Sequence, residues 1–338
     1  MRKTWIKLMA LAMTLMLLVG CGAKEETKEE AKAAVKPETT QEATEKKVSF
    51  DFNGENKEVT IPANPQRVVV IGVDVLDIMD SLGLKDKIVG IVDPKAPTFP
   101  GYLKGYEDVA SIGSLFGDDL EAVAGLKPDL IIAGARTAKA YDGLAEIAPT
   151  VYFKIPGFGM GFKDGLHQNV TMLADIFNVQ DKGNEVIARL DGKLEAMKEK
   201  TSKIEDPSAL FLIVSGKTIG LFSDNEESRY GFVFNEFGFK SPATAEEIKT
   251  NESTHGDSVS FEFISAKNPN YMIVLDRGAA TGTEEVKATD TLDNSLVKST
   301  KAYKDGHIIY VDGTAWYIGT GGVQATEIMI DNLLDALK

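Results

Sequence analysis

The chain has 338 residues, of which 43% are hydrophobic and 26% are charged, a composition typical of a globular protein long enough for two domains. Its formal net charge of −14 at pH 7 argues against a nucleic-acid partner, because nucleic-acid-binding surfaces are basic. Cys21 is the only cysteine, which excludes an internal disulfide and a thiolate zinc site. The three histidines are too scattered to form an obvious metal cluster.

The N-terminus has the features of a bacterial lipoprotein signal. Basic residues precede an apolar run over residues 8–19, which is too short to span a membrane, and Leu18-Val19-Gly20-Cys21 is similar to a lipobox. We therefore predict a signal peptide over residues 1–20 and a lipid, such as palmitate, on Cys21. A plain signal peptide with an incidental cysteine is the alternative. Residues 21–47 are rich in Lys, Glu, Ala and Thr, and this composition predicts a disordered tether.

Residues 48–162 have the pattern of an α/β lobe. Asn53-Gly54 lies between two alternating segments, which predicts a β-hairpin over residues 48–61. Short apolar runs then alternate with helical segments, as they do around a parallel sheet, and the runs lie at residues 67–71, 87–92, 130–133 and 148–152. Phe158 to Phe162 is Gly-rich and is interpreted as a flexible entry to the next segment.

Residues 163–206 contain no proline and have apolar residues at helical spacing. They predict two helices, the second of which runs from about Asp181 to Lys203 and forms a stiff connection. An ordinary surface helix of one larger domain is the alternative. Residues 207–338 then form a second α/β lobe. Its predicted elements are a strand at 209–214, a hairpin partner at 218–222, a short helix with Arg229 near its start, a strand at 307–311 and a closing helix at 323–337.

One sequence unit occurs in both lobes. Glu121 is followed by Pro128 and then Arg136, and Glu262 by Pro269 and then Arg277, with identical spacing. We interpret each copy as a short helix that begins at Glu, a turn at Pro, a buried strand and an Arg at the far end of that strand. In open α/β sheets, ligands bind at the carboxyl ends of the strands.

These blocks, together with Ser228-Arg229-Tyr230-Gly231, His255-Gly256 and Trp316-Tyr317-Ile318, resemble class III solute-binding lipoproteins of ABC importers. Within that class the chain is similar to receptors for ferric catecholate siderophores of the petrobactin and enterobactin type. The resemblance implies an α/β fold of two Rossmann-like lobes joined by one long rigid α-helix. It also implies a monomer that captures a ferric siderophore between its lobes and delivers it to a permease. Such a protein has no catalytic residues and no resident cofactor, and is anchored through Cys21 on the extracytoplasmic face of a membrane, in a Gram-positive cell.

Arg136, Arg229 and Arg277 are the predicted ligand-binding cations. Guanidinium groups suit a polyanionic ferric complex because they donate several hydrogen bonds in one plane and stack on aromatic rings. The alternative for each is an ordinary surface arginine or one paired with a neighbour such as Asp276.

The resemblance also implies that His255 and Tyr317 bind the ligand and complete the coordination of Fe³⁺ when a siderophore is only tetradentate. Imidazole nitrogen and phenolate oxygen suit this hard ion better than sulfur does. His255 lies in a polar stretch, residues 251–258, with the composition of a flexible loop. An exposed loop histidine and a cleft-wall tyrosine that never touches iron are the alternatives.

Glu121 and Glu262 resemble the acidic residues with which the family docks onto arginines of the permease. Stabilisation of a helix start by an acidic side chain is the alternative for both. The same fold could instead bind haem, cobalamin or a hydroxamate siderophore, and a different class of function would be a lipid-anchored hydrolase that uses His255 as a base. The residues do not distinguish among catecholate siderophores.

Overall fold

The computed structural model describes residues 44–114, 117–226, 228–244, 246–248, 255–283 and 286–338. The predicted signal peptide, Cys21 and residues 21–43 lie outside the described residues. Strand β1 begins at Glu45, so the last three residues of the predicted 21–47 tether belong to this strand. Across the described ranges, every helix is too short or too polar to be a candidate for a membrane span.

The first lobe contains a hairpin and a parallel sheet. Strands β1 (Glu45–Phe52) and β2 (Glu55–Pro62) pair antiparallel around Asn53 and Gly54, which both have positive φ, as the Asn-Gly signal predicts. The sheet has the order β5-β4-β3-β8-β9 and all its neighbours are parallel. Its strands are β3 (Val68–Ile71), β4 (Ile88–Ile91), β5 (Ala110–Ser111), β8 (Leu130–Gly134) and β9 (Thr150–Phe153).

Helices and one small hairpin complete this lobe. The hairpin consists of β6 (Gly113–Ser114) and β7 (Gly117–Asp118). The helical elements are α1 (Val73–Ser81), η1 (Lys85–Lys87), α2 (Leu120–Gly125), η2 (Ala135–Ala140) and α3 (Tyr141–Ile147).

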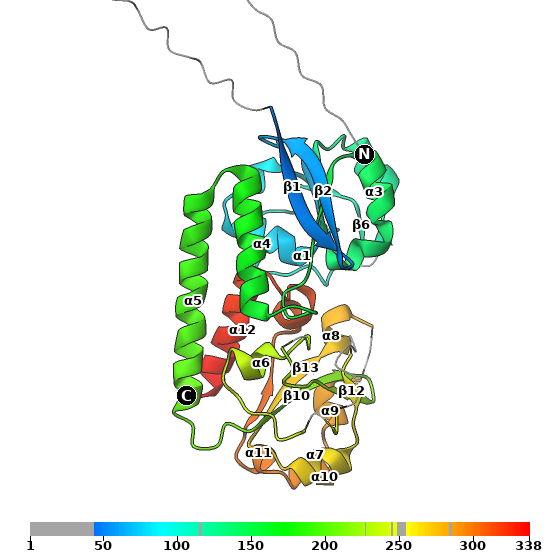
Figure 1. Ribbon diagram of the computed structural model, residues 1–338. Coiled ribbons are helices and arrows are strands. Elements are labelled where there is room, and N and C mark those ends of the chain that lie inside the picture. The colour runs from blue at the N-terminus through cyan, green and yellow to red at the C-terminus, as the bar shows by residue number, and fades with distance from the viewer. Residues whose placement is uncertain (1–43, 115–116, 227, 245, 249–254, 284–285) are drawn as a thin grey trace, which may run out of the picture. The chain divides into compact units, whose positions relative to one another are not determined.

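Two long helices follow, as the sequence predicts. Helix α4 (Phe162–Phe177) ends at Asn178, which has a left-handed conformation, and α5 (Gln180–Ser202) agrees with the predicted second helix to within a residue. With 23 residues, α5 extends for about 34 Å at about 1.5 Å per residue. Figure 1 shows α5 alongside α4 and then alongside α12.

The second lobe has a mixed sheet of the order β12-β11-β10-β13-β14. Strands β10, β13 and β14 are parallel, and the predicted hairpin partner β11 is antiparallel to β10. The strands are β10 (Ala209–Ser215), β11 (Thr218–Leu221), β12 (Asp257–Ser258), β13 (Tyr271–Asp276) and β14 (Ile308–Tyr310).

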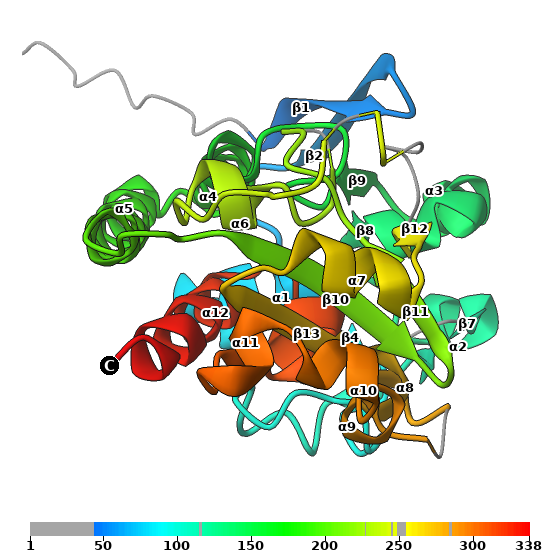
Figure 2. The ribbon, with the colours of Figure 1, turned by 90° about the horizontal axis from the view of Figure 1, so that it is seen from below.

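The helices of this lobe are mostly short, and α9, α10 and α11 gather on one side of it (Figure 2). They are α6 (Phe232–Asn235), α7 (Phe261–Lys267), α8 (Arg277–Thr281), α9 (Ala288–Thr291), α10 (Ser295–Lys298), α11 (Lys301–Lys304), the π-helical η3 (Thr314–Ile318) and α12 (Val323–Ala336). The sequence prediction for Arg229 was wrong in one respect. Arg229 precedes α6 by three residues and lies in a turn, because the chain first bends at Ser228–Gly231 through a bond from the Gly231 N–H to the Ser228 carbonyl.

The repeated unit has the predicted structure in both copies. Asp119 and Ser260 cap α2 and α7 by accepting the backbone N–H groups three residues ahead, so that each Glu is the second residue of its helix. The residue before each proline, Lys127 or Asn268, has positive φ and turns the chain into the strand. Strands β8 and β13 follow.

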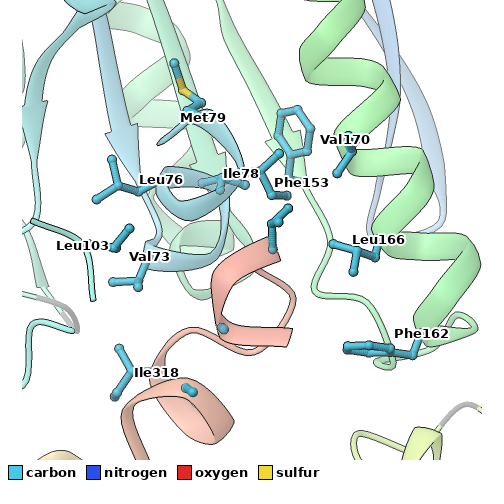
Figure 3. Close-up of a cluster of buried hydrophobic side chains, with 14 of the residues drawn as sticks. Val73, Leu76, Ile78, Met79, Leu103, Phe153, Phe162, Leu166, Val170 and Ile318 are labelled. Carbon is cyan, nitrogen blue, oxygen red and sulfur yellow. The ribbon is translucent and has the colours of Figure 1, made fainter. Parts of the chain in front are cut away.

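The largest hydrophobic core is shared by both lobes. It contains the sheet of the first lobe, the inner faces of α1, α4 and α5, and residues of η3 and α12. Figure 3 shows Phe153, Leu166 and Val170 packed between β9, α1 and α4, with Phe162 and Ile318 farther along. Each such fully buried side chain contributes about 1.5–3 kcal/mol. A smaller core lies in the outer part of the second lobe.

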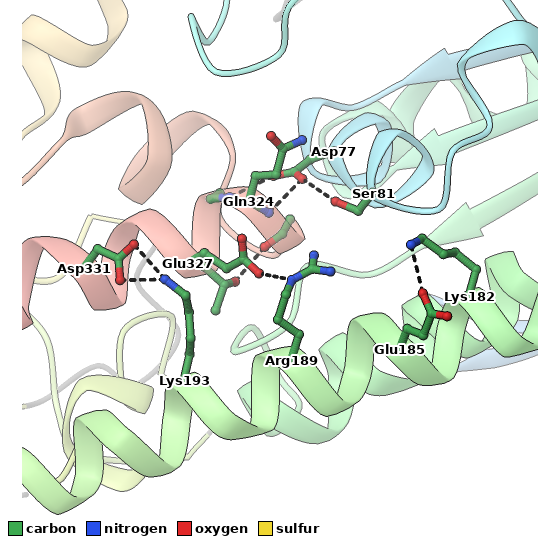
Figure 4. Close-up of polar contacts among 12 residues, drawn as sticks. Asp77, Ser81, Lys182, Glu185, Arg189, Lys193, Gln324, Glu327 and Asp331 are labelled. Atoms are coloured by element: carbon green, nitrogen blue, oxygen red, sulfur yellow. Dashed lines mark hydrogen bonds and ion pairs between the residues drawn. The ribbon is translucent and has the colours of Figure 1, made fainter.

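The last helix, α12, is fixed to elements that precede the second lobe. Asp77 of α1 accepts the backbone N–H groups of Gln324 and Ala325, each at 2.9 Å, and so caps the start of α12. On α5, Arg189 and Lys193 form ion pairs with Glu327 and Asp331, each at 2.6 Å (Figure 4). The C-terminal helix is therefore held by α1 and α5 as well as by its own lobe, which the boundary at residue 207 did not anticipate.

Candidate functional site

The predicted arginines converge on Tyr317, which lies in η3 between β14 and α12. Arg136 donates from Nη2 to the Tyr317 carbonyl at 2.7 Å and from Nη1 to the Ile318 carbonyl at 3.3 Å. Arg229 donates from Nη2 to the same Tyr317 carbonyl at 3.1 Å. One backbone oxygen therefore joins an arginine of the first lobe to an arginine of the second.

Arg277 approaches the other end of the same tyrosine. Its Nε donates to the Tyr317 hydroxyl at 3.0 Å, and its Nη1 donates to Ser215 Oγ at 3.0 Å. The guanidinium carbon of Arg229 lies 4.5 Å from the centre of the Tyr317 ring, and that of Arg277 lies 5.6 Å from it. The ring is thus surrounded by cations at distances typical of cation–π contacts.

An aromatic cluster holds η3 in place. Tyr230, fully buried, donates its hydroxyl proton to the Trp316 carbonyl at 2.9 Å. The Trp316 ring stacks on Phe211 and Phe232, with centroids 5.5 and 6.0 Å apart. Because Tyr230 and Trp316 each neighbour a site residue, this packing positions Arg229 and Tyr317 together.

The clustered cations shift the ionisation of the site. Burial raises the pKa of Tyr317, but the hydrogen bond from Arg277 and the charges of Arg229 and Arg277 outweigh it, so the pKa of this phenol lies below its ordinary value. Burial and the neighbouring charge of Arg229 lower the pKa of Arg136, and nearby Asp74 partly offsets them. The site therefore favours anions, including a phenolate at Tyr317.

His255 belongs to the same electrostatic environment. Its pKa is lowered by burial and by the charges of Arg277 and Arg229. Its backbone lies close to β11, where the His255 carbonyl oxygen occupies the space that a Cβ at Gly220 would need. The next residue, Gly256, has a φ of 72°, a conformation that favours glycine. Residues 251–254 of the predicted loop lie outside the described residues, whereas His255 itself is exposed and is separated from β12 by Gly256 alone.

A cavity of about 570 Å³ opens at this cluster. Arg136, Arg229, His255 and Tyr317 are among its lining residues, whereas Arg277 is not among them and donates a hydrogen bond to the Tyr317 hydroxyl. The other lining residues were not predicted from the sequence; they are Asn53, Ala135, Ala138, Tyr152, Lys154, Ile155 and Phe158. Several follow β9 as Arg136 follows β8, so the strand-end rule applied to β9 would have found them. Phe158, interpreted as part of a flexible entry, is a wall residue.

The remaining candidates lie outside the cavity lining. Glu121 and Glu262 are exposed at equivalent places in the two lobes. A second hollow of about 450 Å³ lies between β1 and α4, away from the three arginines. Among the described residues, no group of three or more His, Cys, Asp or Glu side chains is arranged to hold a metal ion.

Comparison with known proteins assigns the family. The model of the periplasmic binding protein family matches residues 68–315 of the chain. The chain belongs to this family. It is 35% identical over 303 residues to the petrobactin-binding protein YclQ of Bacillus subtilis, and this match covers 89% of this chain and 90% of that protein. It is 32% identical over 279 residues to the ferric-anguibactin-binding protein FatB of Vibrio anguillarum, with 82% and 84% coverage.

Solved structures of periplasmic binding proteins have the same fold. The crystal structure of YclQ matches with a TM-score of 0.78 at 32% identity, covering 87% of this chain and 99% of that chain. The catecholate-siderophore binding protein VctP of Vibrio cholerae matches with a TM-score of 0.75 at 34% identity, covering 86% and 100%. A TroA-like periplasmic binding protein of Xylanimonas cellulosilytica matches at 0.77 and 33% identity, covering 86% and 99%. The fold is the class III arrangement of two α/β lobes joined by a long helix that the sequence predicts.

Proposed function

We propose that this protein is the substrate-binding lipoprotein of an ABC importer and that it captures a ferric catecholate siderophore, of the petrobactin type or related to it. The observation that carries the proposal is the convergence of Arg136, Arg229 and Arg277 on Tyr317 beside a cavity of about 570 Å³. The names of YclQ, FatB and VctP, which mention petrobactin, ferric anguibactin and catecholate siderophores, support the same ligand class.

The charge of the site fits this ligand. A ferric catecholate complex is polyanionic, and an acidic protein with a net charge of −14 needs a local group of cations to hold it. Two of the three arginines line the cavity, and the third donates a hydrogen bond to the hydroxyl of the lining residue Tyr317. Aromatic and apolar side chains at Tyr152, Ile155 and Phe158 supply a surface for the catechol rings.

Direct contact with iron is the finer part of the proposal. When a bis-catecholate leaves two coordination positions open, the Tyr317 oxygen and a His255 nitrogen fill them, as both residues line the cavity. The lowered pKa of Tyr317 favours the phenolate that Fe³⁺ requires, and the lowered pKa of His255 favours the neutral imidazole. A hexadentate siderophore would leave both residues as ordinary contacts.

Delivery to the permease uses other surfaces. Glu121 and Glu262, one in each lobe, dock onto arginines of the permease dimer, while lipid on Cys21 holds the protein at the extracytoplasmic face of the membrane. Replacement of both acids by alanine should leave ligand affinity unchanged but reduce iron uptake by cells. Glu185 and Glu195, exposed on α5, provide a matched control pair. Equal losses of binding and uptake in the Glu121/Glu262 variant would show that these acids are structural.

A ligand panel tests the proposed substrate class. Quenching of Trp and Tyr fluorescence should report tight binding of ferric petrobactin or ferric enterobactin, and much weaker binding of ferrichrome and haem. Ferrichrome, a hydroxamate siderophore, is included because the iron(3+)-hydroxamate-binding protein FhuD of Bacillus subtilis is 26% identical to this chain over 305 residues. Tight binding of ferrichrome or haem alone would overturn the catecholate proposal. Turnover of an esterase substrate, abolished by His255→Ala, would overturn the binding role itself.

A further inference from the structure

Lys154 is a cation of the cavity that the repeated unit does not supply. It follows β9 directly and lines the same cavity as Arg136 and Tyr317. Its Nζ forms an ion pair with Asp51 Oδ1 at 2.9 Å, and the two side chains are 35% and 43% exposed. Arg136 differs, because its hydrogen bonds go to backbone carbonyls. The charge of Lys154 is therefore balanced by a carboxylate at the edge of the cavity.

Asp51 is held at its place by the hairpin. The Gly54 N–H donates to Asp51 Oδ1 at 3.1 Å, which fixes the carboxylate above the turn. The neighbouring Phe52 packs edge-on against Tyr152 at 5.0 Å and lies 4.3 Å from Tyr141. These rings join the hairpin to β9 and α3, and they place Asp51 beside the cavity wall.

The backbone of Lys154 is also fixed, whereas its ammonium is not. Its carbonyl accepts a hydrogen bond from Nδ2 of the buried Asn169 at 2.9 Å. The ammonium stands at the end of a flexible four-carbon chain. It can thus leave Asp51 and turn toward the cavity without any movement of the backbone.

We infer that Lys154 binds an anionic group of the ligand that lies outside the iron centre. On ligand binding, its ammonium leaves the Asp51 carboxylate and pairs with this group instead. This inference rests on the proposed function, since it assumes an anionic ferric complex in the cavity. The arginines and Tyr317 hold the iron-bearing part, and Lys154, which lines the cavity and pairs with Asp51 near the Asn53 turn, meets the substituents. A siderophore that carries a free carboxylate then gains a contact that a purely catecholate complex lacks, while Asp51 holds the ammonium back from uncharged ligands.

Two ferric probes with and without a carboxylate test this role in the full-length protein. One is the ferric complex of a bis-catecholamide whose linker carries a pendant carboxylate, and the other is the ferric complex of the same bis-catecholamide on an uncharged linker. Lys154→Gln should weaken binding of the carboxylate probe about fivefold and affect the second probe less than about twofold, the scale of a partly exposed charge pair. Lys154→Arg should restore binding, which separates the charge from any effect on folding.

The partner residue provides the second half of the test. Asp51→Asn should strengthen binding of the carboxylate probe, because it removes the competing anion, and this gain should vanish in the Asp51→Asn, Lys154→Gln double variant. Equal weakening of both probes by Lys154→Gln, or no weakening at all, would overturn the inference while leaving the proposed function intact. Failure of the unmodified protein to bind either probe would instead reject the proposed function, and the inference with it.

Discussion

Tyr317 is the residue at which the contacts of both lobes meet. Its carbonyl accepts from Arg136 and Arg229, and its hydroxyl accepts from Arg277. The hydrogen bond from Arg277 and the charges of Arg229 and Arg277 stabilise the phenol oxygen in its deprotonated form, and so lower its pKa. The residue therefore combines a structural task, joining the lobes through its backbone, with a chemical one at its hydroxyl.

An alkaline titration tests this effect on Tyr317. The chain has nine tyrosines, and seven of them have a raised pKa because they are buried or lie near acids: Tyr102, Tyr106, Tyr141, Tyr152, Tyr230, Tyr271 and Tyr310. The pKa of Tyr317, in contrast to these seven, is lowered. As pH rises, the tyrosinate absorbance should begin to increase below the ordinary range of tyrosine, and Tyr317→Phe should remove this first step. An early step that persists in Tyr317→Phe would contradict the assignment.

Phe158 illustrates a residue whose role only the structure reveals. It is 38% exposed, lines the cavity and lies between Gly157 and Gly159, which both have positive φ. From the sequence, three glycines around two phenylalanines indicate mobility. The fold places the loop against the second lobe, where a Cβ at Gly157 would lie 3.1 Å from the Arg229 carbonyl oxygen.

Phe158→Ala should therefore weaken binding of aromatic ligands selectively. Loss of an aromatic contact worth about 0.5–1.5 kcal/mol predicts a loss of about two- to tenfold for ferric petrobactin, and no change for ferric citrate, which has no ring. Tyr303→Ala is the matched control, since Tyr303 is an exposed aromatic outside the cavity lining. A similar loss for both ligands would show that Phe158 acts on the shape of the loop and not on the ring.

At the scale of elements, the repeated unit was predictable and its surroundings were not. Spacing alone places Arg136 and Arg277 after strands because Glu, Pro and Arg mark a helix start, a turn and a strand end in fixed order. Arg229 belongs to no such unit, so its position before α6 depends on a turn that leaves no periodic signal. The docking of α12 on α1 depends on contacts between residues about 247 apart in the chain, which local patterns do not encode.

The cap of α12 by Asp77 carries a prediction about pH. Burial raises the pKa of Asp77 from 3.8 to about 7. The two backbone N–H donors lower this pKa, and the negative charges of Asp80 and Glu327 raise it further. The folded protein thus binds a proton here that the unfolded chain has already released. The free energy of unfolding should fall as pH rises from about 4 to about 7, by at most about 1.4 kcal/mol per pH unit from this group.

Asp77→Asn isolates that contribution, because the other titrating groups remain. Urea unfolding of both proteins across this range should show a shallower decline in the variant, so that the stability difference between them changes with pH and becomes constant above the raised pKa. Parallel curves for the two proteins would mean that Asp77 stays ionised in the fold throughout the range.

At the scale of the whole molecule, the site exists only where the lobes meet. Arg136 comes from the first lobe, Arg229, His255 and Arg277 come from the second, and Tyr317 lies on the segment that leads into α12. Helix α5 and the caps and ion pairs on α12 keep these parts in register. The two-lobed architecture followed from the alternation of strands and helices, whereas the contacts across it follow from three-dimensional packing.

The central claim is that the three arginines hold an anionic ferric complex, Arg136 and Arg229 from the cavity lining and Arg277 through Tyr317. The most direct test is calorimetric titration of ferric petrobactin into the unmodified protein and into a variant with Arg136, Arg229 and Arg277 all replaced by glutamine, with thermal unfolding as the check on folding. Charge-assisted hydrogen bonds contribute about 1.5–3 kcal/mol each, so the folded variant should lose several kcal/mol of binding free energy. A folded variant that binds ferric petrobactin as tightly as the unmodified protein would contradict the account.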